Sequence, residues 1–205
     1  MIRFFFNCLF GSVIPILFFL IFWWSSLLFT NDNMFISIAA FLGLGIGIVI
    51  SLHLKMTLKT DIYSLSTPIL IMIYLFYNFG MFGFFMGVPV FHLFLGIVAG
   101  FYWTQRLIYQ NSTIDYKSEI SRISIFTSII VGFVCLFSAI FALLSKSTPY
   151  DLKHMFHLSF DISQSILICF IIIGGAVLIL SQYWLTKATM ILILKRNNKL
   201  PLTKT

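Results

Sequence analysis

Long apolar stretches constrain the fold of this chain more than any other feature. From Phe4 to Phe29 no charged residue interrupts the sequence, and further apolar runs follow along the chain. A helix needs about 20 consecutive apolar residues to cross the hydrocarbon core of a bilayer. With 60% hydrophobic and only 9% charged residues, the chain has too few polar residues to cover a water-soluble domain. We therefore expect an all-α, polytopic integral membrane protein with a single transmembrane domain over residues 1–205.

Counting apolar residues against this length predicts six transmembrane helices. Pro15 predicts a kink in the first of them. Pro68, with Ser66 or Thr67 as the preceding cap, predicts the start of the third. The predicted spans cover residues 4–29, 34–54, 68–85, 88–104, 123–144 and 162–185, followed by a basic tail over residues 186–205.

Spans three and four are predicted to be unusually short. The apolar stretch from Pro68 to Thr104 has 37 residues, so two helices of about 17 residues would each reach roughly 25 Å, against a core of about 30 Å. They either meet as a tight outward hairpin or form a re-entrant pair. Both arrangements return the chain to the side from which it started.

The polar segment after span four carries a helix-start pattern. Ser112 and Asp115 stand in the S-x-x-D form that begins many helices. Apolar residues at helical spacing follow it. We expect span five to begin as a water-exposed helix and to enter the membrane near Ile123. Beyond span six, the apolar stretch up to Leu194 is expected to lie at the interface or to project past it.

The positive charges are distributed asymmetrically across the six-span arrangement. Only Lys146 and Lys153 of the 13 Lys and Arg residues fall on one side. The positive-inside rule therefore places both termini in the cytoplasm of a multi-pass cell-membrane protein. The residues on the cytoplasmic side are Arg3, Lys55, Lys59, Arg106, Lys117, Arg122, Lys187, Lys195, Arg196, Lys199 and Lys204.

Small residues recur at four-residue intervals in spans two and four. Such ridges let helix backbones approach closely within a membrane, where lipid removes the hydrophobic drive for association. We expect the two ridges to pack and spans two and four to cross closely. The ridge residues are Ala39, Gly43 and Gly47 in span two, and Gly96 and Gly100 in span four.

Asn78 and His92 are the central polar candidates for a substrate-binding site. No Asp, Glu, Lys or Arg falls near the centre of a predicted span, which disfavours a proton-driven pump. Short helices interrupted by Gly and Pro often line the binding site of a transporter. The alternative is an interhelical hydrogen bond for Asn78 and a neutral interfacial position for His92.

The predicted outer loop carries a candidate metal site. If the loop is helical, His154, His157 and Asp161 recur at i, i+3 and i+7 on one face. Two imidazoles and a carboxylate are suitable ligands for zinc or another transition metal. The H-E-x-x-H spacing of metalloproteases is absent. An amphipathic helix at the outer interface explains the same residues.

These observations leave three classes of function open. The first is a transport component that binds a solute or ion at the 68–104 hairpin. The second is a structural or assembly subunit of a membrane complex, and the third, less favoured, is a metal-assisted membrane enzyme. The sequence identifies no catalytic residues and no cofactor. Its expected partners are the bilayer and a membrane protein or second copy of the chain, and no nucleic acid.

In size, number of helices and basic cytoplasmic ends, the chain is similar to the substrate-binding components of vitamin importers of the energy-coupling-factor type. That resemblance implies a solute-binding role beside a membrane partner. It concerns architecture alone. The family's A-x-x-x-A ridge in the first helix is absent here, where only Gly11 and Ser12 precede Pro15.

Overall fold

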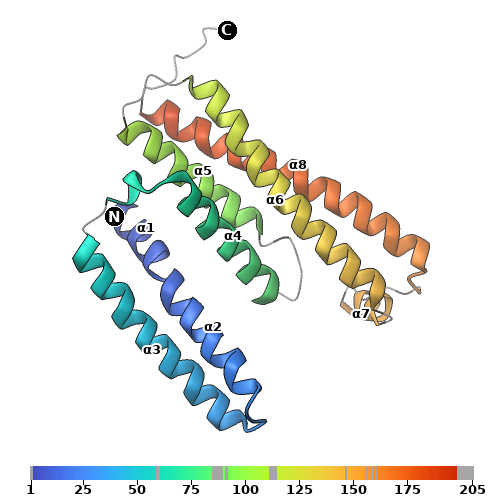
Figure 1. Cartoon of the computed structure of the whole chain (residues 1–205). Coiled ribbons are helices and arrows are strands. Elements are labelled where there is room, and N and C mark those ends of the chain that lie inside the picture. The colour runs from blue at the N-terminus through green and yellow to red at the C-terminus, as the bar shows by residue number, and fades with distance from the viewer. Residues whose placement is uncertain are drawn as a thin grey trace, which may run out of the picture. The chain divides into compact units, whose positions relative to one another are not determined.

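The computed structural model describes residues 2–58, 61–84, 90, 92–110, 115–145, 147–155, 157, 159 and 161–197. The regular secondary structure of these residues is helical and includes no strand, which confirms the predicted all-α class. Figure 1 shows the elements: α1 (Ile2–Gly11), α2 (Val13–Leu27), α3 (Asn33–Leu58), the 3-10 turn η1 (Ile62–Ser64), α4 (Thr67–Phe84), α5 (His92–Tyr109), α6 (Tyr116–Leu144), α7 (Thr148–Met155) and α8 (Gln164–Arg196).

Four helical segments of the described chain are long and apolar enough to cross a membrane. They correspond to predicted spans one, two, five and six, and the first combines α1 with α2. The middle pair, α4 and α5, has 18 residues in each helix and is not among the four segments found in the described residues. The four segments are Arg3–Leu27, Asn33–Leu54, Tyr116–Leu144 and Gln164–Arg196.

Two helices continue beyond the predicted spans. α5 ends at Tyr109, past the predicted span end at Thr104. α8 ends at Arg196, so the apolar stretch up to Leu194 continues span six as one helix, as the sequence predicts. No helix-breaking residue separates span six from the apolar stretch behind it. Buried residues also continue at four-residue spacing on one face of α8: Gln182, Thr186, Met190 and Leu194.

The start of α6 corrects the predicted helix start. Residues 112–114, including Ser112, lie outside the described residues. The helix begins at Tyr116, and Asp115 is its N-cap, because the Asp115 carboxylate accepts a hydrogen bond from the Lys117 backbone N–H at 3.1 Å. The S-x-x-D pattern therefore located the cap one turn too early.

The chain divides into two compact units, residues 1–73 and 74–205, and the boundary falls within α4. In the first unit, α2 and α3 lie side by side (Figure 1). The ridge on α3 faces α2. A Cβ added at Gly43 would lie 2.6 Å from the Phe18 carbonyl oxygen, and one at Gly47 would lie 2.6 Å from the Pro15 Cα. The helices can approach this closely because these positions are glycine.

The kink predicted in span one is a break at Ser12, between α1 and α2. Pro15 has no N–H, so the carbonyl of Gly11 receives no helical hydrogen bond. The Ser51 hydroxyl of α3 donates to that carbonyl at 2.7 Å. The break is thus satisfied by a side chain from the neighbouring helix.

In the second unit, α5 and α8 run parallel and α6 runs antiparallel to both (Figure 1). The ridge on α5 faces α8, so each ridge packs against a helix other than the one the sequence suggested. The residue pairs that fix these directions are 96/182 and 100/186 for α5 with α8, and 127/186 and 132/179 for α6 with α8. The ends of α5 and α8 meet the start of α6 around a core of Leu107, Ile120, Ile123, Met190 and Leu194.

Candidate functional site

Several polar groups are buried between the helices of the second unit. We call this set the buried polar layer. Gln182 lies two positions past the midpoint of α8, and Thr186 lies one turn further along the same face. The layer comprises Tyr74 and Asn78 of α4, Ser124 and Thr127 of α6, and Gln182 and Thr186 of α8.

The structure brings the two predicted binding residues together. Asn78 is 2% exposed and His92 is fully buried at the start of α5. The His92 Nε2 lies 3.0 Å from the backbone oxygen of Asn78, and this contact requires Nε2 to carry the proton because a carbonyl only accepts. The Asn78 amide nitrogen donates to the Tyr74 carbonyl at 2.7 Å. The contact between the two residues thus uses the Asn78 backbone, while its side-chain oxygen has no hydrogen-bond partner among the described residues.

Gln182 is the most unusual member of the layer. Its side chain is fully buried, and neither its amide nitrogen nor its amide oxygen has a partner in the described part of the chain. The amide lies over Gly96 of α5, and a Cβ at that position would overlap it. The small residue therefore makes room for a polar side chain whose hydrogen bonds are unmade.

Tyr74 adds a hydroxyl to the same region. The hydroxyl lies toward the side chains of Asn78 and Gln182, and it too is buried without a partner among the residues described. Its ring packs against Phe126 of α6, with the centroids 5.8 Å apart. Aromatic packing therefore holds the hydroxyl in place beside two amides.

Thr127 and Thr186 form the one cross-helix hydrogen bond between side chains that the described layer contains. Their hydroxyl oxygens are 3.0 Å apart and join α6 to α8. Both side chains are fully buried. Gly100 of α5 faces the same turn, since a Cβ there would lie 3.0 Å from the Thr186 backbone oxygen.

Sequence reasoning missed four members of the layer, because it searched the span centres for charged residues. Gln182 carries a detectable signal: after Gln164 it is the only Asn or Gln in α8, and it stands near the middle of the longest helix. The threonines carry little signal, because threonine is common in membrane helices and often bonds to its own backbone.

The described layer offers only neutral amide and hydroxyl groups. Such groups recognise a ligand through directional hydrogen bonds, and within a membrane those bonds form without competition from water. The chemistry available to the layer is therefore binding of a small polar or singly charged species.

The loop after α6 differs from the predicted helical face. α7 ends at Met155, and His157 follows with a backbone φ of 51°, a left-handed conformation that interrupts a helix. His154, His157 and Asp161 therefore do not share a helical face. The His154 ring packs on Tyr150 with centroids 4.2 Å apart. Among the described residues, no group of three or more His, Cys, Asp or Glu side chains could hold a metal ion.

Asp161 forms an ion pair with Lys153. The Lys153 ammonium donates to the carboxylate at 2.6 Å, and this hydrogen bond and charge lower the pKa of Asp161 below its usual value. The predicted metal ligand is therefore engaged by a lysine.

Comparisons with protein-family models, with curated proteins and with solved structures found no match to this chain.

Proposed function

We propose that this chain is a transport component of the cell membrane that binds a small polar solute or ion at the buried polar layer. The proposal extends the expected 68–104 hairpin site, which supplies Tyr74, Asn78 and His92, by adding the facing residues of α6 and α8. Transporters commonly bind substrate near the bilayer midplane between short or interrupted helices. Two features support this reading: the short helices α4 and α5, and the burial of the Gln182 side chain against Gly96 of α5.

The proposed topology has six spans with both termini in the cytoplasm. An 18-residue helix reaches about 27 Å at 1.5 Å per residue, close to a core of about 30 Å. The ends of α5 and α8 and the start of α6 share one end of the second unit. In a membrane, that common end carries the excess of positive charge expected on the cytoplasmic side.

The observation that carries the functional proposal is the Gln182 amide. A buried polar group without a partner costs about 1–3 kcal/mol, and in hydrocarbon no water can relieve that cost. We therefore expect Gln182 to destabilise the helix packing of the second unit when no ligand is bound. A ligand that accepts a hydrogen bond from the amide nitrogen or donates one to the amide oxygen would supply the missing partner and offset this cost.

Native mass spectrometry of Gln182→Met tests the proposal. Methionine is unbranched and of similar length, so it fits the same space over Gly96 without the amide. We expect a bound small-molecule mass on the wild-type protein after extraction in mild detergent, and its loss in Gln182→Met. Gln164→Met is the matched control, because Gln164 is exposed at the start of the same helix. The control should retain the mass.

Two results would contradict the proposal: a wild-type protein that retains no small ligand, or a Gln182→Met variant that retains the same ligand. Thermal unfolding separates the alternative of a structural subunit. If Gln182 serves binding, the variant should be more stable by about 1–3 kcal/mol, because the unpartnered amide is gone. If Gln182 serves packing, the variant should be less stable.

A further inference from the structure

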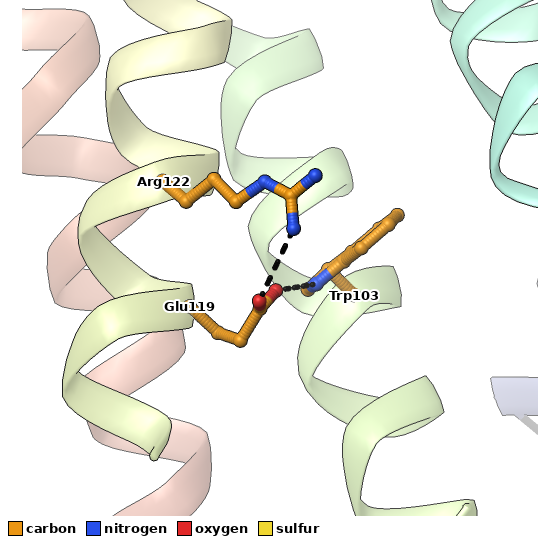
Figure 2. A network of polar contacts seen from close by, with 3 residues as sticks. All are labelled: Trp103, Glu119 and Arg122. Atoms are coloured by element: carbon orange, nitrogen blue, oxygen red, sulfur yellow. Dashed lines mark hydrogen bonds and ion pairs between the residues drawn. The ribbon is translucent and has the colours of Figure 1, made fainter. Parts of the chain in front are cut away.

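The helix ends that meet in the second unit carry a second polar group, separate from the buried polar layer. Trp103 of α5 faces Glu119 of α6 across the interface, and Arg122 lies one turn further along α6 (Figure 2). The indole N–H donates to one carboxylate oxygen at 3.2 Å, and the Arg122 guanidinium contacts the other at 3.5 Å. Both oxygens of Glu119 therefore have partners.

Arg106 is the group at this end whose hydrogen bonds are incomplete. It follows Trp103 by one turn, and its guanidinium carbon lies 5.1 Å from the centroid of the Trp103 ring. One terminal nitrogen, Nη1, is buried and has no partner among the described residues. A guanidinium has five N–H donors and strongly favours an anionic acceptor.

The surroundings of Arg106 are electropositive. The described residues at this end of α5, α6 and α8 include five basic side chains, against the carboxylates of Asp115 and Glu119. Arg122 itself is 74% exposed. The basic side chains are Arg106, Lys117, Arg122, Lys195 and Arg196.

The position of Arg106 along its helix suits the headgroup region of a bilayer. It lies three residues before the end of α5, beside Trp103 and near Tyr109. Aromatic residues at helix ends mark the interface between hydrocarbon and water. The core of Leu107, Ile120, Ile123, Met190 and Leu194 fixes the helices beneath it, so the site is built on rigid elements.

We infer that Arg106, stacked on Trp103, binds the phosphate of an anionic phospholipid. A phosphate accepts two parallel N–H bonds from the guanidinium fork, and the rotatable bonds of the arginine stem let the fork turn toward it. Basic pockets between membrane helices on the cytoplasmic side bind lipid headgroups in this way. The inference is independent of any ligand at the buried polar layer.

Lipid competition in native mass spectrometry tests the inference. The delipidated full-length protein is exposed to equal amounts of phosphatidylglycerol and phosphatidylcholine with identical acyl chains. We expect the wild type to retain phosphatidylglycerol preferentially and Arg106→Gln to lose about tenfold of that preference, the size of one charge-assisted contact. Arg122→Gln removes the same charge from the same end at an exposed position, and it should retain most of the preference.

Three results would overturn the inference. The first is equal retention of the two lipids by the wild type, and the second is an equal loss in Arg106→Gln and Arg122→Gln. The third is displacement of the lipid by excess inorganic phosphate, which would make a soluble anion the ligand. If Arg106→Gln does not fold, Arg106→Lys keeps the charge without the fork and should show an intermediate preference. Full wild-type preference in that variant would also count against the inference.

Discussion

The two units use glycine ridges for opposite purposes. In residues 1–73, Gly43 and Gly47 bring α3 against the backbone of α2. No space for a side chain remains at this interface, and most of the contacting atoms of α2 are main-chain atoms. In residues 74–205, Gly96 leaves a space that the Gln182 amide occupies. The same four-residue spacing therefore joins two helices in one unit and admits a polar side chain between helices in the other.

The largest expected effect is at Gly47. Gly47→Leu places side-chain atoms where the Pro15 backbone already lies, and backbone cannot move aside as a side-chain end can. We expect loss of folded protein, or destabilisation beyond the ~1–3 kcal/mol typical of overpacking. Fluorescence-detected size-exclusion chromatography after heating measures it.

Gly45→Leu is the matched control for this change. It lies on the same helix, two residues away, and a Cβ there would meet nothing within 4 Å. The control should behave as wild type. If the two variants gave equal amounts of equally stable folded protein, the close packing of α3 on α2 at Gly47 would be contradicted.

The second effect is smaller, concerns Gly96, and depends on the side chain at position 182. Gly96→Ala collides with the end of the Gln182 side chain, which can rotate away at a cost of about 1–3 kcal/mol. Shortening that side chain should remove the collision, so Gly96→Ala combined with Gln182→Ala should regain stability. A double-mutant cycle on thermal unfolding should give a coupling of about 0.5–3 kcal/mol. Additive effects would show that the two residues do not share this space.

The smallest effect concerns Thr127. Thr127→Val keeps the shape of the side chain and removes its hydrogen bond to Thr186. Cross-helix hydrogen bonds in membranes average about 0.6 kcal/mol, so we expect a small loss of stability in the second unit. Thr189→Val is the control, because the Thr189 hydroxyl bonds to its own helix at Leu185. If Thr189→Val lost more stability than Thr127→Val, the bond between Thr127 and Thr186 would stabilise the unit no more than a hydrogen bond within one helix.

The sequence predicted the helices well where length and hydropathy decide the outcome. The apolar runs located α3 and the membrane-embedded part of α6 closely, because few other structures suit such runs. α5 continues past the predicted span end at Thr104, since a polar residue such as Gln105 does not stop a helix.

The candidate site was less accessible to sequence reasoning. Residue spacing shows that Gly43 and Gly96 lie on ridges, but it does not identify the helix each ridge faces, because that choice depends on the whole packing. Asn78 and His92, predicted on two short helices, are in contact through the Asn78 backbone, and their role in binding stays a prediction. The prediction for the loop after α6 was wrong because it assumed helical spacing through His157. The backbone of His157 is left-handed, and no sequence pattern at this position predicts that conformation.

The hydrogen bond from Ser51 to the Gly11 carbonyl has a consequence for biosynthesis. The donor stands 40 residues after the acceptor. The ribosome therefore synthesises α1 and α2 before it reaches Ser51, the residue that donates to the free Gly11 carbonyl. An unsatisfied carbonyl in lipid costs several kcal/mol. We therefore expect α2 and α3 to leave the insertion machinery together as a preformed hairpin.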